Sequence, residues 1–138
     1  MEWMVMPLKR YADFSGRSRR KEYWMFVLLQ IIIVVGITII GGVLGGFSSD
    51  VSGGMPFGGG LMMGLFGLYF LAIIIPSIAV QVRRFHDQDK SGWFVLLNFV
   101  PYIGGLIVFI FMCLDGTRGK NRFGEDPKAS ETIGDVFE

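Results

Sequence analysis

YWMFVLLQIIIVVGITIIGGVLGGF, residues 23–47, is the stretch that decides the fold, because it contains no charged side chain. About 24 helical residues at ~1.5 Å each cover more than the roughly 30 Å hydrocarbon core of a bilayer. Tyr23 and Trp24 stand at its start, where aromatic rings favour the membrane interface. The stretch therefore predicts a first membrane-spanning helix.

Two more apolar runs follow it. Residues 61–82, LMMGLFGLYFLAIIIPSIAVQV, also carry no charge, and Pro76 is expected to kink this second span because its ring removes a backbone hydrogen bond. Residues 93–114, WFVLLNFVPYIGGLIVFIFMCL, form a third run with Pro101 near its middle. The third run is either one more span or a re-entrant hairpin broken around Pro101.

The length of residues 93–114 and the charge of the tail, residues 115–138, favour different paths. About 22 residues match a crossing of ~30 Å, whereas each arm of a hairpin would have about eleven residues and reach half depth. The tip of a hairpin would also need protein to cover its backbone. A hairpin would, however, return the cations of the tail to the cytoplasmic side. We expect a single crossing kinked at Pro101.

Composition and charge distribution indicate a membrane protein of one domain. Of the 138 residues, 51% are apolar, and the mean hydropathy is +0.51. Lys and Arg number six in residues 1–22, none in 48–60, three in 83–92 and four in 115–138. By the positive-inside rule, the N-terminus and residues 83–92 face the cytoplasm, and residues 48–60 face outside. We expect an all-α membrane fold of about three transmembrane segments. Residues 1–22 are expected to form an amphipathic arm on the membrane surface, and residues 115–138 a polar C-terminal tail.

Glycines four positions apart indicate close helix packing. Gly41 with Gly45, and Gly42 with Gly46, would let two helix backbones approach each other in lipid. Packing within one chain is favoured over contacts between copies. Replacing Gly42 by Leu is therefore expected to perturb folding or assembly.

The densest group of polar side chains lies in residues 83–92. A hydrogen bond between His86 and Asp87 is expected to fix this loop, with Arg83 and Arg84 against lipid phosphates. The alternative is enzymatic use of the same His and Asp. One His and one Cys are too few for a zinc site. We expect no metal, no cofactor and no catalytic residue.

Three segments carry a family resemblance: FSGRSRRKEYW at 14–24, RRFHDQDKSGW at 83–93 and GTRGKNRFGEDP at 116–127. In that order they resemble the signatures of the domain of unknown function 805 family, which comprises small bacterial inner-membrane proteins. The Asp89-Lys90 pair departs mildly, since family members often have Gly or Asp followed by Arg there. The resemblance implies location and fold and no reaction. The motif positions expected to matter are Arg17, Arg20, Glu22, Trp24, Arg84, His86, Asp87, Ser91, Gly92, Trp93, Asn121, Gly124, Asp126 and Pro127.

The favoured function is a non-enzymatic membrane adaptor. The face formed by residues 1–22 and 83–92 holds nine Lys and Arg against five acidic residues, a net charge of nine minus five, or +4. Anionic lipid headgroups are therefore the expected partners, together with a membrane protein or a second copy of the chain. No nucleic-acid partner is expected. The alternatives are an oligomeric pore or small-solute carrier, and a membrane enzyme using His86 and Asp87.

Overall fold

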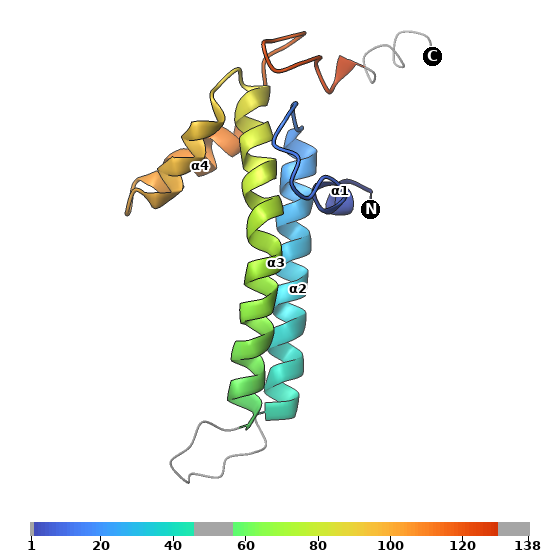
Figure 1. Ribbon diagram of the computed structural model, residues 1–138, viewed down its shortest axis with the longest axis vertical. Coiled ribbons are helices and arrows are strands. Elements are labelled where there is room, and N and C mark those ends of the chain that lie inside the picture. The colour runs from blue at the N-terminus through green and yellow to red at the C-terminus, as the bar shows by residue number, and fades with distance from the viewer. Residues whose placement is uncertain (1, 46–56, 130–138) are drawn as a thin grey trace.

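The computed structural model describes residues 2–45 and 57–129. These residues form α1 (Glu2–Lys9), α2 (Arg20–Gly45), α3 (Phe57–Asp87), the 3-10 helix η1 (Gly92–Phe99) and α4 (Gly104–Cys113), with one isolated β-bridge between Asn121 and Gly124. Figure 1 shows α2 and α3 as a long antiparallel hairpin, with the other elements gathered toward the end where α2 begins and α3 ends. The loop 48–56, Gly46 and residues 130–138, which entered the predictions above, lie outside the described residues.

The long hairpin presents an apolar surface. Residues 20–43 and 60–87 are each long and apolar enough to cross a membrane. Their outward side chains are exposed, among them Ile39 at 60%, Leu68 at 70% and Leu71 at 67%. Water-soluble proteins rarely expose contiguous apolar surface of this extent, so the hairpin suits a lipid solvent.

A close approach at Gly41 and a side-chain hydrogen bond hold the apolar parts of α2 and α3 together. A Cβ on Gly41 would lie 1.6 Å from the Met62 sulfur, so glycine lets the flexible Met62 side chain pack directly on the backbone of α2. Closer to the start of α2, the Tyr69 hydroxyl donates to the Gln30 side chain. Gly42 has nothing within 4 Å of where its Cβ would lie, so the expectation that it is a contact within the chain is wrong, and Gly41 is the packed residue.

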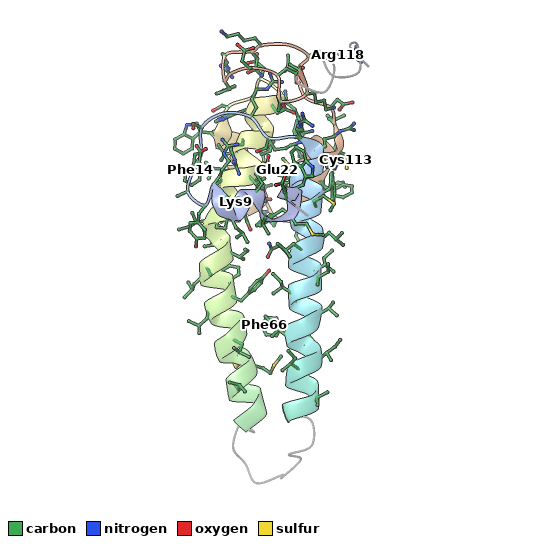
Figure 2. The ribbon with its side chains drawn as sticks, turned by 90° about the vertical axis from the view of Figure 1, so that its right-hand side faces the viewer. Lys9, Phe14, Glu22, Phe66, Cys113 and Arg118 are labelled. Atoms are coloured by element: carbon green, nitrogen blue, oxygen red, sulfur yellow. The ribbon has the colours of Figure 1, made fainter. Side chains whose placement is uncertain are left out.

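The arm is fastened to α3 at the backbone defect that Pro76 creates. Because proline has no N–H, the carbonyl of Ala72 loses its partner four residues later in the helix. The hydroxyl of Tyr11 donates to this carbonyl. Figure 2 shows α1 lying across the two long helices, which is the placement expected of an interfacial arm. Its Trp3 ring faces the Arg19 and Lys21 cations at 5.1 and 5.5 Å.

The third apolar run is a hairpin and not a crossing. After η1 the chain reverses at residues 100–103, where the Gly104 amide donates to the Val100 carbonyl at 3.1 Å. Tyr102 adopts a left-handed φ of 66° at the tip. A Cβ on Gly104 would lie 1.8 Å from the Leu97 carbonyl oxygen, so a glycine is needed where η1 and α4 meet.

The end of α4 returns to the end of α3. The Gln88 amide donates to the Phe111 carbonyl, and the Arg84 guanidinium donates to the Leu114 carbonyl. The expectation of a single crossing kinked at Pro101 is therefore wrong, and the re-entrant alternative describes the backbone (Figure 1). The physical reason is a pair of side-chain donors after the apolar part of α3, Arg84 and Gln88, which bind carbonyls at the end of α4.

A small apolar core holds this end together. Phe85, Val108 and Met112 are buried in it, with Tyr23, Trp24 and Phe111 packed around them. The Trp24 and Phe109 rings meet edge to face, with their centres 5.7 Å apart. The core therefore lies between the start of α2, the end of α3 and α4, directly beneath the three motif segments.

Candidate functional site

The three motif segments converge in a polar cap, defined here as residues 10–22, 83–92 and 114–129. Asp87, the last residue of α3, lies at its centre with a side chain 4% exposed. Its Oδ1 accepts from Arg17 Nε at 2.9 Å, and its Oδ2 accepts from Arg84 Nη1 at 2.5 Å. One carboxylate therefore holds two buried guanidinium groups, one from the arm and one from its own helix.

The same two arginines bind the tail. Arg17 Nη1 donates to the Gly119 carbonyl at 2.6 Å, and its Nη2 donates to the Thr117 carbonyl. The Thr117 amide donates in turn to the Asp87 carbonyl at 2.6 Å. A Cβ on Gly116 would lie 1.9 Å from Asp87 Oδ2, so the tail passes the carboxylate at a distance that only glycine allows.

A second buried ion pair lies beside the first. Arg83 Nη2 lies 3.3 Å from Glu22 Oε1, and both side chains are almost fully buried. Figure 2 shows Glu22 in the middle of the cap, between α2 and α3. Among the described residues, both Arg83 Nη atoms, Glu22 Oε1 and the Ser18 hydroxyl lack a geometrically sound hydrogen bond. Such unpartnered buried groups are costly, so this pair is the weakest part of the network.

The expectation that Arg83 and Arg84 contact lipid phosphates is wrong. Arg83 and Arg84 are both 0% exposed and bind protein groups, so they do not contact lipid phosphates. Their long side chains fold inward because Glu22 and Asp87 offer carboxylates there. These charges stabilise the cap from within and add little to its outer surface.

The expected pair of His86 and Asp87 does not form. Both residues belong to the last turn of α3, and consecutive helical residues point in different directions. His86 Nδ1 donates to the Gly16 carbonyl at 3.1 Å, and the imidazole stacks on Phe123 with centres 3.9 Å apart. Asp87 pairs with Arg84, three residues away, which is a spacing that a helix brings together.

The tail closes over the cap through a polar turn. Asn121 Nδ2 donates to the His86 carbonyl at 2.9 Å, and Gly119 and Gly124 adopt positive φ values of 74° and 136°. Asp126 accepts from the Gly119 and Lys128 amides, and the Lys128 amide is the main cause of its lowered pKa. The Pro127 carbonyl accepts from Arg19.

Ion pairs line the outer rim of the cap. Asp115 lies 2.8 Å from Arg20 and 2.9 Å from Lys128, and the hydrogen bond from Lys128 lowers its pKa. In the arm, the Ser15 hydroxyl and then Arg10 hold the pKa of Asp13 at about 2, below the ordinary 3.8. These exposed pairs orient the loops and contribute little stability.

Two hollows open on the cap. One of about 410 Å³ is bordered by charged and polar residues, namely Asp87, Asp115, Thr117, Arg118, Asp126 and Lys128. The other, of about 510 Å³, is mainly apolar and is lined by Phe14, Val82, His86, Trp93, Val95 and Phe123, with Ser91 and Gly92 beside them. In residues 2–45 and 57–129, no group of three His, Cys, Asp or Glu side chains is arranged to hold a metal ion.

The motif positions chosen from sequence fall into three places. The buried network holds Arg17, Glu22, Arg84 and Asp87; the apolar hollow is bordered by His86, Ser91, Gly92 and Trp93; the closing turn and the start of α2 hold Asn121, Gly124, Asp126, Pro127, Arg20 and Trp24. Sequence reasoning missed Tyr11, Gly116 and Thr117, whose partners are backbone or carboxylate atoms distant in sequence. The one available signal was Pro76, which indicates a free carbonyl at residue 72.

The chain has relatives over nearly its whole length. The profile of a family described as "Protein of unknown function (DUF805)" matches residues 11–125. The inner membrane protein YhaI of Escherichia coli (strain K12) is 44% identical over 128 residues, covering 93% of this chain and 97% of the relative. The inner membrane protein YhaH of the same strain is 42% identical, with 93% and 98% covered. No solved structure matches the chain. With the two long apolar helices, these relatives confirm the predicted all-α membrane fold.

Proposed function

The chain belongs to the DUF805 family of proteins of unknown function, and from that premise we propose that it is a non-enzymatic adaptor whose polar cap faces the cytoplasm and binds anionic lipid headgroups. One observation carries the proposal. All thirteen Lys and Arg belong to the polar cap or to Lys9 at the end of α1, and none lies elsewhere on the long hairpin. By the positive-inside rule, this distribution supports two crossings by α2 and α3 with both chain ends cytoplasmic.

The outer cations are the part of the cap available to lipid. Within the described residues, Lys9, Lys21 and Arg118 are exposed and have no carboxylate within ion-pair distance. Lys21 lies over the Trp3 ring of α1, and Lys9 is the last residue of α1, which lies across the hairpin where the apolar helices give way to the cap. Aromatic and basic side chains in this arrangement suit the headgroup level of a bilayer.

The contacts do not support the enzymatic alternative, which needs His86 and Asp87 to act together. Asp87 is enclosed by two arginines, and His86 uses one ring nitrogen to hold the arm. In the part of the chain that the structure describes, α2 and α3 meet directly along the seam at Gly41, which supports packing and not a pore. The contacts therefore favour the adaptor.

The test is lipid preference in reconstituted bilayers. Spin-labelled phosphatidylglycerol and phosphatidylcholine would be compared around the wild type and a Lys9→Gln, Lys21→Gln variant. Each cation near an anionic leaflet contributes on the order of 1 kcal/mol, so the variant should lose about fivefold or more of its preference for phosphatidylglycerol. Lys120→Gln, which removes a cation paired with Glu125, is the matched control and should change little. Equal association of both lipids with the wild type would contradict the proposal.

A further inference from the structure

The apolar hollow on the cap is a groove built by all three motif segments. Phe14 comes from the arm, His86 and Trp93 flank the turn after α3, and Phe123 comes from the tail. The volume of about 510 Å³ is within the range of small-molecule sites. None of the buried ion pairs described above needs this space, so packing of the cap does not explain it.

Gly92 leaves space in the groove, and two exposed aromatic residues border it. A Cβ on Gly92 would lie 2.7 Å from Val82 Cγ1 and 3.2 Å from His86 Nε2, so a side chain here would intrude on the wall. The Trp93 side chain is 78% exposed and that of Phe14 is 43% exposed, although both border an apolar hollow. Large aromatic side chains left open beside a cavity are typical of a surface that receives an apolar ligand.

Polar atoms in and beside the groove indicate what kind of lipid headgroup would fit there. Because the Gly16 carbonyl can only accept, His86 Nδ1 carries the proton and Nε2 of the neutral ring is an acceptor. Nε2 lies beside Gly92 on the groove wall. Two cations lie beside the groove and outside its lining. The Arg122 guanidinium lies 4.7 Å from the centre of the Phe123 ring, and Lys90 precedes Ser91 of the groove wall, with its Nζ 5.8 Å from the centre of the Phe94 ring.

These two cations exceed the acidic charge beside them. Asp89 pairs with Arg122 at 3.3 Å, whereas Lys90 contacts only aromatic rings among the described residues. The loop at the groove therefore retains one net positive charge. An anionic phosphate complements this charge, and a hydroxyl donor complements Nε2.

The apolar wall continues into the surface that suits lipid. Val82 lies near the end of the apolar run of α3, and Val95 lies on η1, whose neighbouring Leu96 and Phe99 are 49% and 80% exposed. A chain leaving the groove along η1 would stay on apolar surface. This continuity favours a lipid over a soluble peptide.

We propose that the groove binds one anionic phospholipid with a hydroxyl-bearing headgroup, of the phosphatidylglycerol type. An acyl chain lies against Val82, Trp93 and Val95, the phosphate faces Lys90 and Arg122, and a headgroup hydroxyl donates to His86 Nε2. The site rests on the proposed function, because it assumes a membrane-facing cap. It differs from that function in requiring one discrete lipid where the outer cations need only a general attraction.

The test uses protein reconstituted in nanodiscs of phosphatidylglycerol and phosphatidylcholine in equal amounts, released into the gas phase and weighed with its retained lipid. Wild type should keep one phosphatidylglycerol. Trp93→Ala should reduce that population about tenfold, as loss of an aromatic anchor does. Phe70→Ala is the matched control, since it removes an aromatic side chain of α3 that is 60% exposed and does not line the groove, and it should retain the lipid.

A second variant tests the headgroup contact. In His86→Asn the side-chain amide can still donate to the Gly16 carbonyl, while the acceptor at Nε2 is lost, so the preference for phosphatidylglycerol over phosphatidylcholine should fall. Equal retention by wild type, Trp93→Ala and His86→Asn, or no retained lipid on wild type, would overturn the groove. The Lys9 and Lys21 measurement is separate, so a failed groove with preserved bulk preference leaves the proposed function standing. A lipid retained in the groove without bulk preference removes the general attraction of the outer cations and keeps the membrane-facing cap.

Discussion

Asp87 organises the cap because it joins residues that are far apart in sequence. It binds Arg17, which is 70 positions earlier, and Arg84, which is three positions earlier, while Gly116 of the tail passes against its carboxylate. A buried carboxylate between two guanidinium groups is a structural anchor, because removing it leaves two buried charges without a partner.

We therefore predict that Asp87→Asn lowers the free energy of unfolding by about 3–5 kcal/mol in detergent, as breaking a buried pair generally does. Thermal or denaturant unfolding followed by circular dichroism would measure this change. Asp115→Asn is the control, since this carboxylate also has two cationic partners but is 61% exposed, and it should cost at most about 1 kcal/mol. Equal effects of the two substitutions would show that the Asp87 cluster is solvated.

At the scale of elements, the arm and the third apolar run depend on single backbone groups. The Tyr11 hydroxyl occupies the Ala72 carbonyl that Pro76 leaves free, and Gly104 allows η1 and α4 to meet at the Leu97 carbonyl. Both contacts replace or protect backbone hydrogen bonds at positions where water is scarce, so each should have a measurable effect on stability.

The arm contact can be tested with a double-mutant cycle. Tyr11→Phe should destabilise the protein by about 1 kcal/mol, because the Ala72 carbonyl loses its donor. Pro76→Ala restores an N–H that can bond to this carbonyl within the helix, so Tyr11→Phe should cost little in that background. Additive effects of the two substitutions in unfolding experiments would mean that the hydroxyl and the proline are uncoupled.

The hairpin can be tested with neighbouring glycines. Gly104→Ala should destabilise the fold by about 1–3 kcal/mol or more, since its methyl group would lie 1.8 Å from a backbone oxygen that cannot move alone. Gly105→Ala has nothing within 4 Å of its added carbon and should be neutral or slightly stabilising, because alanine favours a helix. Melting temperatures that rank the two variants in the opposite order would exclude the hairpin geometry.

The helices could be predicted from sequence, whereas the path of the third run could not. Charge-free runs at residues 23–47 and 61–82 indicate α2 and α3 directly, because charge-free helices of this length match the hydrocarbon core of a bilayer. The return of the tail depends on Arg17 and Arg84 meeting carbonyls 100 and 30 residues away, respectively. Length favoured a crossing for residues 93–114, and no local pattern reveals such distant partners.

The motif residues could likewise be recognised from sequence, whereas their contacts could not. Asp87 and His86 were recognised as a dense polar group, but adjacency in sequence suggested a pair that the helix geometry forbids. Arg83 and Arg84 were placed at lipid because arginines are usually exposed, whereas Glu22 and Asp87 draw them inside. The sequence therefore predicts which residues matter, whereas the groups that they bind become known only from the fold.

For the whole molecule, the central claim is that all three motif segments lie on one side of the membrane. The tail binds the arm through Arg17 and Arg19, so the N-terminal and C-terminal segments share one compartment (Figure 1). The proposed orientation makes that compartment the cytoplasm, with α2 and α3 as the two crossings and the η1–α4 hairpin entering from the cytoplasmic side.

Reporter fusions in a bacterial host test this claim most directly. A fluorescent protein that folds only in the cytoplasm and an alkaline phosphatase that is active only outside it would each be fused after Glu138, with a phosphatase inserted between residues 53 and 54 as the control. We predict a fluorescent C-terminal fusion without phosphatase activity, and an active phosphatase in the loop. Phosphatase activity and no fluorescence at the C-terminus would contradict the shared cap and restore three crossings.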